Sequence, residues 1–342
     1  MRFFYNLGIR LYGATLTLAS LFNSKAKKWV NGRKNYFNDL PKIDHEKPLI
    51  WFHCASLGEF DQGLPLMNRF KSENPDSTLL VTFFSPSGME FYQKRDHKVD
   101  IALYLPLDTP NNAKRFIDHF SPKITVFVKY EFWINHLLEA KKSDSKLYCI
   151  SGLFRKDQAF FKWYGSYFRE GLNAFDNIFV QNQRSADLLS SIKMNSWTVS
   201  GDTRIDKVID NKNNVERDSI LENFVGNEQV LVLGSSWPTG EKYLFPYINK
   251  CGHKVIIAPH DISESHIDQL LKGIQVPCER YTAFNENSEA KVLILDTIGQ
   301  LANAYSYATV AYVGGGFSGS LHNILEPAVF GVPVLFGPKH DK

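Results

Sequence analysis

The amino-acid sequence predicts an α/β protein made of two doubly wound, Rossmann-like domains. Its length of 342 residues suits about two domains. Short apolar runs alternate with helical stretches, and a polar, Asn-rich stretch separates two such series. Hydrophobic residues make up 44% of the chain and charged residues 22%. These proportions are typical of a globular protein that buries a core without disulfides or structural metal.

The first series of apolar runs lies between residues 49 and 200. The runs are short and rich in β-branched and aromatic residues, as in strands that are buried on both faces of a parallel sheet. Helical stretches between them favour crossover connections. The runs are LIWFHCA (49–55), LLVTFF (79–84), IALYL (101–105), ITVFV (124–128), KLYCIS (146–151), NIFV (177–180) and WTVS (197–200).

A second series follows residues 206–225, which we interpret as a linker with a connecting helix. It consists of VLVLGSS (230–236), KVIIAP (254–259), KVLILD (291–296), TVAYVGG (309–315) and VPVLFG (332–337). We therefore expect domains at 46–205 and 226–342, with a cleft between them and ligands at the carboxyl ends of the strands. No covering helix follows the last run, so we expect the second domain to be truncated at its C-terminal end.

The first 45 residues differ from the rest in charge. They hold eight basic and two acidic residues, whereas the remaining chain holds 31 basic and 34 acidic residues. The apolar stretch 3–22 is interrupted by Asn6 and Arg10 and is followed by a basic cluster from Lys25 to Lys34. This pattern predicts membrane association, either as an interfacial helix or as a single anchor. The alternative is a buried first helix of the N-terminal domain.

Two function classes receive no support from the sequence. Nucleic-acid-binding domains are usually basic on their folded body, and this body is nearly neutral. The four cysteines lie far apart, without a CxxC pair or metal-like spacing to histidine. We therefore expect no nucleic-acid partner and no metal site.

The motif SLGEFDQG (56–63) directly follows the first predicted strand. Glu59 would lie in the first turn of the next helix, at the carboxyl end of the strand, where a carboxylate can act as a general base. The alternative is a capping box, in which Ser56 caps the helix and Glu59 reaches back to a backbone N–H. Asp61 is a weaker second candidate.

The segment YVGGGFSGSLHNILEPAVFGVPVLFGP (312–338) is the second candidate site. Three glycines end a strand, and a helix is expected to begin near Asn323. Backbone N–H groups of such a loop can bind a phosphate, and Glu326 can accept hydrogen bonds from a ribose diol. The alternative is an ordinary strand–turn–helix with a glutamate in its first turn.

Shorter motifs end several other predicted strands. GSSWP (234–238), APHD (258–261) with His260, and DTIGQL (296–301) with Gly299 each have the alternative of a plain turn. VKYEFW (128–133) places Lys129, Glu131 and Trp133 near the expected cleft. GDTRID (201–206) places Arg204 at the domain junction, where a guanidinium can clamp an anion or form a structural salt bridge.

Together these motifs resemble those of the 3-deoxy-D-manno-octulosonic acid (Kdo) transferases of lipopolysaccharide synthesis. The resemblance covers nearly the whole chain in the family's order. It rests on the apolar and basic N-terminus, SLGE, TFFSPSG (82–88), YLPLDTP (104–110), YEFWIN (130–135), GDTRID, SSWP, DTIGQL and the stretch from GGGF through HNILEPA to FGP.

The resemblance implies a GT-B glycosyltransferase at the cytoplasmic face of the inner membrane. It would move Kdo from CMP-Kdo to the 6-hydroxyl of a lipid A precursor (lipid IVA), with inversion, and without metal or cofactor. Its partners would be CMP-Kdo, the lipid A precursor and inner-membrane lipids. Glu59 would be the general base, while Arg204 and Lys129 would lie near the leaving phosphate. The implied CMP contacts are Ala258, Pro259, Ile298, Gly299, Gln300, Asn323, Ile324, Leu325 and Glu326.

The sequence departs from the family pattern at two positions. Lys129 stands where many members carry an acid, with Glu131 two places later, and Pro259 stands where many carry Arg. The alternatives are another GT-B sugar-nucleotide enzyme, such as a UDP-sugar transferase or an epimerase, and a catalytically silent membrane adaptor.

Overall fold

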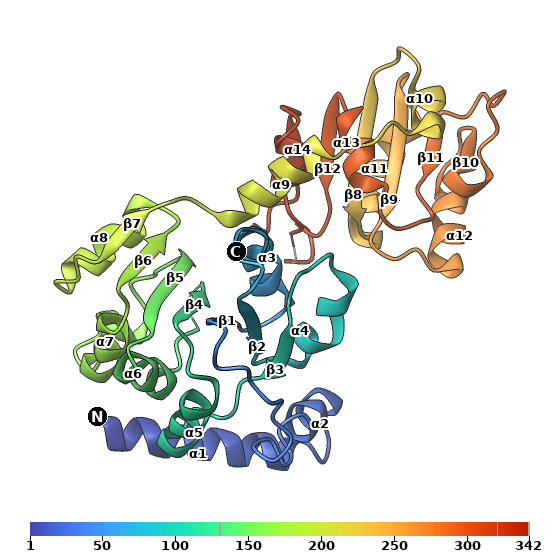
Figure 1. The fold of residues 1–342 in the computed structure, drawn as a ribbon. Coiled ribbons are helices and arrows are strands. Elements are labelled where there is room, and N and C mark those ends of the chain that lie inside the picture. The colour runs from blue at the N-terminus through green and yellow to red at the C-terminus, as the bar shows by residue number, and fades with distance from the viewer. Residues whose placement is uncertain (130, 320, 341–342) are drawn as a thin grey trace. The chain divides into compact units, whose positions relative to one another are not determined.

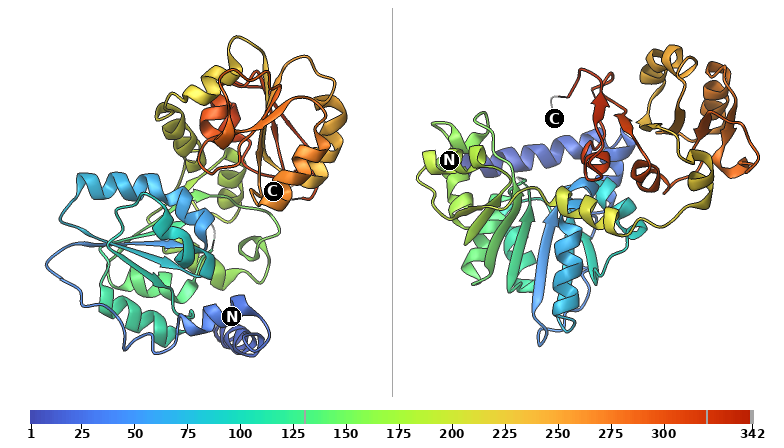
Figure 2. Two further views of the ribbon diagram at one scale, coloured as in Figure 1. Left: turned by 90° about the vertical axis from the view of Figure 1, so that its right-hand side faces the viewer. Right: turned by 90° about the horizontal axis from the view of Figure 1, so that it is seen from above.

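The computed structural model describes residues 1–129, 131–319 and 321–340, and it divides into two compact units, Met1–Arg204 and Ile205–Lys342. Each unit is an α/β domain built on a parallel sheet, with helices on both faces of the sheet (Figures 1 and 2). The predicted fold class is therefore confirmed. Tyr130 and Ser320, which belong to two of the motifs above, lie outside the described residues.

Among the described residues of the first unit, the sheet has seven strands in the order β3-β2-β1-β4-β5-β6-β7, all parallel. The order runs outward from β1 and β4 in opposite directions, as in a doubly wound sheet. The strands are β1 (Leu49–Cys54), β2 (Thr78–Phe83), β3 (Ile101–Tyr104), β4 (Ile124–Val128), β5 (Lys146–Gly152), β6 (Asn177–Val180) and β7 (Trp197–Val199).

The helices of this unit precede the sheet or connect its strands. They are α1 (Arg2–Ala19), α2 (Ser24–Asn31), α3 (Leu57–Glu73), α4 (Pro86–Phe91), α5 (Pro110–Phe120), α6 (Ile134–Lys142), α7 (Ser166–Asn173) and α8 (Gln183–Ser191), with 3₁₀ turns η1 (Tyr92–Lys94) and η2 (Ala159–Phe161).

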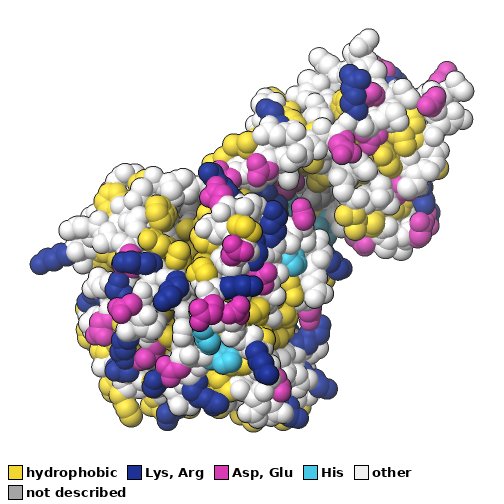
Figure 3. Space-filling view, viewed as in Figure 1, with side chains coloured by type: hydrophobic (Ala, Val, Ile, Leu, Met, Phe, Trp, Pro, Cys, Tyr) yellow, Lys and Arg dark blue, Asp and Glu magenta, His cyan; other side chains and the backbone are white. Residues whose placement is uncertain are grey.

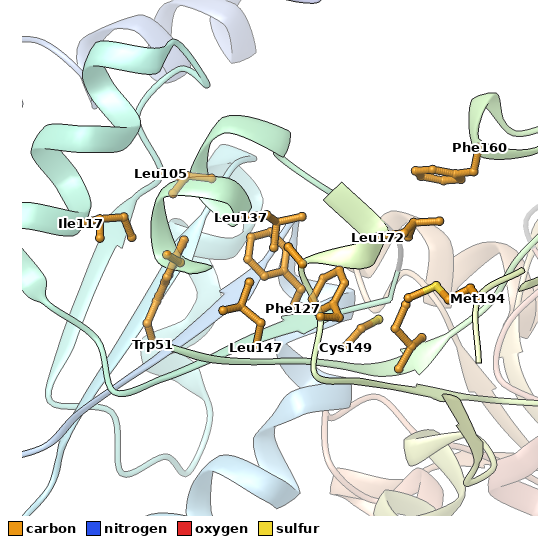
Figure 4. Close-up of a cluster of buried hydrophobic side chains, with 14 of the residues drawn as sticks. Trp51, Leu105, Ile117, Phe127, Leu137, Leu147, Cys149, Phe160, Leu172 and Met194 are labelled. Atoms are coloured by element: carbon orange, nitrogen blue, oxygen red, sulfur yellow. The ribbon is translucent and has the colours of Figure 1, made fainter. Parts of the chain in front are cut away.

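Strand β1 shows why the sheet is buried on both faces. All six of its residues are buried, and alternate side chains enter opposite clusters. Trp51 packs with Phe127 and Leu147 on one face (Figure 4), whereas Phe52 packs with Val81 and Val126 on the other. The near-continuous apolar runs in the sequence follow directly from this double burial.

In the described residues of the second unit, a parallel sheet of six strands has the order β10-β11-β9-β8-β12-β13. Val232 and Leu233 in β8 enter clusters on opposite faces. The strands are β8 (Val230–Ser236), β9 (Lys254–Pro259), β10 (Cys278–Arg280), β11 (Val292–Ile294), β12 (Val310–Val313) and β13 (Val334–Phe336). The helices are α9 (Thr203–Asn213), which begins at the unit boundary, α10 (Ser219–Val225), α11 (Pro238–Ile248), α12 (Glu264–Gly273), α13 (Leu301–Ser306) and α14 (Leu325–Ala328), with the 3₁₀ turn η3 (Tyr281–Ala283).

The segment interpreted as a linker contains helix α10 and most of α9. Ser151 at the end of β5 holds the start of α9, because its hydroxyl pairs with Thr203 Oγ1 at 2.8 Å and accepts from the Thr203 N–H at 3.1 Å. Asp218 caps α10 by accepting a hydrogen bond from Leu221 N–H at 3.0 Å. Both helices therefore begin at defined anchor points.

Helix α1 lies along the first unit beside α5, α6 and α7 (Figure 1). The Tyr5 hydroxyl donates to Asp108 Oδ2 at 2.5 Å, and Asn135 Nδ2 donates to Asn6 Oδ1 at 2.9 Å. The rest of the helix is exposed or half-buried. Within residues 1–129, 131–319 and 321–340, no helix combines the length and apolarity needed to cross a membrane.

One member of the predicted basic cluster has a structural position. Arg33 lies 3.9 Å from the Trp29 ring centroid and donates to the backbone carbonyls of Leu105 and Phe84 at 2.8 and 2.9 Å. Burial lowers the pKa of its guanidinium to about 9. It therefore fixes the chain after α2 and does not add to the exposed basic surface. On the face shown in Figure 3, Lys and Arg lie among Asp and Glu side chains.

Candidate active site

Glu59 and Lys129 meet at the carboxyl edge of the first sheet. α3 starts directly after β1, so Glu59 lies in its first turn, and Lys129 follows the neighbouring strand β4. Lys129 Nζ is 3.8 Å from Glu59 Oε1, and the two side chains are 22% and 16% exposed. A half-buried carboxylate beside an ammonium group can accept a proton while the cation offsets nearby negative charge.

The capping-box alternative for Glu59 is wrong. The Ser56 side chain accepts no hydrogen bond from a helix N–H; its hydroxyl donates to the Glu59 carboxylate. Asp61, the weaker candidate, receives hydrogen bonds from Arg95 Nε and Nη2 at 2.7 and 3.2 Å. Asp61 is thus held in an ion pair on the side of α3.

The backbone of Lys129 is fixed in an uncommon conformation. Its φ angle is +75°, in the left-handed region that non-glycine residues seldom occupy. Its N–H donates to Ile150 O at 2.8 Å, and its carbonyl accepts from the Cys149 thiol at 3.1 Å. Such positions occur at functional sites, where surrounding contacts hold the residue in place.

His53, near the end of β1, is buried at this edge of the sheet, and the sequence analysis did not identify it. His53 Nδ1 pairs with Thr82 Oγ1 at 3.0 Å, and its Nε2 accepts from Trp133 Nε1 at 3.1 Å. Burial lowers the pKa of His53, so the ring is neutral, and its partners place the proton on Nδ1. The ring therefore orients Trp133, which packs on Phe84 at 4.4 Å between centroids.

Glu131 adds a second carboxylate beside His53. Its Oε2 is 3.8 Å from His53 Nε2, and this buried oxygen has no hydrogen-bond partner among the described residues. An unpartnered buried acceptor is costly unless a ligand supplies the donor.

Arg204 is the last residue of the first unit. Its Nε and Nη2 donate to Asp202 Oδ2 at 2.8 and 2.5 Å, and its side chain is exposed. The salt-bridge alternative is therefore realised in this structure. The neighbouring Thr203 is bonded to Ser151 on β5, the strand next to β4.

In the second unit, the predicted CMP contacts follow three strands. Ala258 and Pro259 end β9, and Ile298, Gly299 and Gln300 form the exposed turn before α13. Asn323, Ile324, Leu325 and Glu326 lie at α14, which comprises four residues and not the longer helix that was expected. Asn323 Oδ1 accepts from Leu325 N–H at 3.1 Å, and Asn323 Nδ2 lies 3.4 Å from Glu326 Oε1. Burial raises the pKa of Glu326.

The glycines after β12 are needed for backbone packing. A Cβ at Gly314 would lie 1.9 Å from Ser235 O, and one at Gly316 would lie 2.6 Å from Gly337 N. The Gly314 N–H donates to Gly234 O at 2.9 Å. Gly314 and Gly316 therefore let three loops come together at the carboxyl edge of the sheet.

Three rings gather at that edge, and the sequence analysis singled out only His260. Trp237 stacks on His260 with centroids 4.3 Å apart, and Trp237 Nε1 donates to His322 Nε2 at 3.0 Å. The rings come from the ends of β8 and β9 and from the loop after β12. Their planar and hydrogen-bonding surfaces suit a base, a sugar or a phosphate. In the part of the chain that the structure describes, no group of three or more His, Cys, Asp or Glu is placed to hold a metal ion.

The chain shares its fold of two parallel-sheet domains with solved structures. It is similar to the UDP-GlcNAc 2-epimerase of Neisseria meningitidis bound to UDP-GlcNAc, with a TM-score of 0.57 and 15% identity over 85% of this chain and 82% of that chain. A putative UDP-N-acetylglucosamine 2-epimerase from Listeria monocytogenes gives a TM-score of 0.54 at 15% identity, over 85% and 79% of the two chains. At such identity the likeness concerns the fold alone.

The family follows from the sequence. The family model described as 3-Deoxy-D-manno-octulosonic-acid transferase (kdotransferase) matches residues 31–207, just over half of the chain. The chain belongs to this family of glycosyltransferases, which confirms the resemblance and the predicted enzyme class, a Kdo transferase of lipopolysaccharide biosynthesis.

Curated relatives agree with this assignment. The 3-deoxy-D-manno-octulosonic acid transferase of Rickettsia felis is 26% identical over 313 residues, which is 88% of this chain and 66% of that protein. The enzyme of the same name from Chlamydophila psittaci is 29% identical over 311 residues, which is 87% of this chain and 71% of that protein. The chain thus spans about two thirds of the length of these relatives.

Proposed function

We propose that the protein transfers Kdo from CMP-Kdo to the 6-hydroxyl of a lipid A precursor, lipid IVA, with inversion at the anomeric carbon and without a metal. The observation that carries the proposal is the half-buried Glu59 facing Lys129 at the carboxyl edge of the first sheet. Family membership supplies the reaction class, and this pair supplies a base and a cation.

The reaction is a single displacement. Glu59 takes the proton of the acceptor hydroxyl while its oxygen forms a bond to the anomeric carbon of Kdo. The bond from that carbon to the CMP phosphate breaks, and the phosphate oxygen keeps the electron pair. Lys129 and Arg204 would offset the charge on the leaving phosphate.

The second unit would hold the donor. CMP would contact Ala258 and Pro259, the turn Ile298–Gln300 and the segment Asn323–Glu326, with Glu326 on the ribose. The nearby rings of Trp237, His260 and His322 offer further contacts. For transfer to occur, the donor held by the second unit must reach Glu59.

The acceptor requires a membrane location. We place the enzyme at the cytoplasmic face of the inner membrane, with α1 and the lysines after it against the lipid. Exposed apolar side chains along α1, such as Phe3, Phe4 and Leu11, support this placement. The middle of α1 lies near the candidate site, because Tyr12 packs on Phe84 at 6.2 Å between centroids.

Substitution of Glu59 tests the assignment of the base. Glu59→Gln keeps the size of the side chain but cannot take a proton, so turnover should fall by about 10²–10⁴. Glu73→Gln is the control, because Glu73 lies on the same helix in an exposed pair with Arg69. The assay is formation of Kdo-lipid IVA by mass spectrometry, with CMP-Kdo affinity measured by calorimetry. Near-wild-type turnover of Glu59→Gln would exclude Glu59 as the base.

A sugar-nucleotide epimerase or UDP-sugar transferase is the second candidate, favoured only by the fold of the solved neighbours. A nucleotide-binding panel distinguishes the two, because our proposal expects CMP to bind more tightly than UDP. Tighter binding of UDP would favour the second candidate. A catalytically silent adaptor would bind lipid but form no product in the transfer assay.

A further inference from the structure

The loop between β5 and α7 presents two aromatic side chains to solvent. Trp163 is 92% exposed and Tyr164 is 41% exposed, and their ring centroids are 5.6 Å apart. An indole ring is amphipathic and is poorly accommodated by water alone. The reaction proposed above uses neither residue.

The base of this loop is firmly packed. Phe154 and Phe160 are buried, and Arg169 Nη1 donates to the carbonyls of Phe160 and Lys162 at 2.9 and 3.1 Å. A Cβ at Gly165 would lie 2.1 Å from Ala159 O, so the loop closes tightly on itself. The contacts therefore hold the exposed Trp163 outward from an ordered base.

The same packing joins the loop to α1. Phe160 packs on Phe168 at 6.2 Å, Phe168 packs on Tyr5 at 5.7 Å, and Tyr5 packs on Tyr167 at 5.3 Å between centroids. Next to Tyr5 on α1, Phe3 and Phe4 are 72% and 68% exposed. The exposed aromatic residues of α1 and of the loop thus project from one packed body, in which α1 runs beside α7 (Figure 1).

The charge around the loop suits an anionic bilayer. Arg155, Lys156 and Lys162 lie in the same segment as Trp163, with Asp157 as the acidic residue among them. Trp and Tyr concentrate at the headgroup level of membranes, and Lys and Arg beside them attract anionic lipid. A single weak contact gives reversible binding, whereas two contacts on one rigid body hold a protein firmly.

We propose that residues 153–165 form a second membrane contact, which inserts Trp163 into the interface of an anionic bilayer next to α1. The inference rests on the proposed function in that a lipid acceptor brings the enzyme to a membrane. The new claim is that residues 153–165 bind the membrane together with the N-terminal segment. Because the loop follows β5 at the carboxyl edge of the sheet, the two contacts would turn that edge, with Glu59 and Lys129, toward the lipid.

Vesicle binding tests the loop directly. The full chain, Trp163→Ala and Trp163→Phe are titrated with phosphatidylglycerol/phosphatidylcholine vesicles, with Tyr247→Ala as the control. Tyr247 is 51% exposed on α11 of the second unit. We expect Trp163→Ala to weaken binding about tenfold through the lost apolar area, and Tyr247→Ala to leave it unchanged. Equal affinity of the full chain and Trp163→Ala would overturn the inference.

Brominated acyl chains give a second readout. Bromine quenches a tryptophan that enters the bilayer, so the full chain should lose fluorescence on such vesicles. Trp163→Phe keeps an apolar ring for binding but removes this indole, and the quenching should fall with it. Unchanged quenching in Trp163→Phe would show that Trp163 stays outside the lipid.

The transfer assay separates this inference from the proposed function. With acceptor dissolved in detergent, Trp163→Ala should retain the turnover of the unsubstituted chain, since the residue lies outside the catalytic groups. If Trp163→Ala loses turnover in detergent as well, the loop contributes to catalysis and the proposed membrane role is wrong. Failure of the unsubstituted chain to form any product would reject the proposed function, while the vesicle titrations would still decide the role of Trp163.

Discussion

Glu326 is the residue at which stability and ligand binding are expected to oppose each other. Burial raises its pKa, so the native state holds the proton more tightly than the unfolded state does. The charged form at neutral pH therefore lowers the stability of the second unit, and stability should rise as the pH falls through the native pKa. We expect Glu326→Gln to raise the melting temperature at pH 7 and to weaken CMP binding.

Two measurements check this prediction. Differential scanning calorimetry between pH 5 and 8 should show a smaller pH dependence for Glu326→Gln than for the parent chain, and titration calorimetry should show the loss of CMP affinity. Glu286→Gln is the control, because Glu286 is an exposed partner of Asn223. Unchanged CMP affinity in Glu326→Gln would remove the ribose role.

Some residues of the candidate sites could be identified from sequence motifs and others could not, and the difference has a physical cause. The sequence placed Glu59 and Lys129 each at the carboxyl end of a strand, but only the structure shows that these strands, β1 and β4, are neighbours. His53 and Trp133 are 80 positions apart, and Trp237 and His322 are 85 apart. Their contacts depend on strand order and side-chain rotamers, which the motifs do not encode.

At the scale of elements, α1 is held by a polar anchor. Asp108 accepts from the Tyr5 hydroxyl at 2.5 Å, from Asn135 N–H at 3.0 Å and from His136 N–H at 3.0 Å. Burial alone would raise the pKa of Asp108, but its hydrogen bond to His136 and the other donors lower it. Removal of one donor leaves a buried carboxylate less well satisfied, at about 1–3 kcal/mol.

Tyr5→Phe should therefore loosen α1 while the sheet stays folded. We expect faster hydrogen exchange over residues 2–19 in vesicle-free buffer and little change in β1. Leu11→Ala is the control, because Leu11 is exposed on the same helix. Equal protection of α1 in Tyr5→Phe and the parent chain would contradict the anchoring role.

The strands themselves were the most predictable elements. Each of the twelve apolar runs overlaps a strand, and most of these strands are buried on both faces, which demands a run of apolar residues. β10 was missed, since Cys278–Arg280 is a short edge strand with two charged residues. The helix expected near Asn323 is one turn long, because the chain turns at Gly331 with a φ of +78° soon after it. Local signals therefore predict apolar strands better than a short polar strand or the length of a helix.

At the scale of the whole molecule, each unit has its own buried core. The clusters around Trp51 and Phe52 contain residues of the first unit, and those around Val232 and Leu233 contain residues of the second. A unit with a core of its own can unfold as a cooperative block. A substitution that destabilises one unit should therefore lower the unfolding temperature of that unit and leave the unfolding temperature of the other unit unchanged.

Gly314→Ala should destabilise the second unit where the loop after β12 packs on the end of β8. The new Cβ would lie 1.9 Å from the Ser235 carbonyl oxygen, so backbone must move, at about 3 kcal/mol. Gly252→Ala is the matched control in the same unit, since a Cβ there meets nothing within 4 Å. By calorimetry we expect Gly314→Ala to lower the transition assigned to the second unit and Gly252→Ala to leave both in place. An equal fall of both transitions in Gly314→Ala would show that the two cores unfold as one, and the description of the molecule as two folding units would fail.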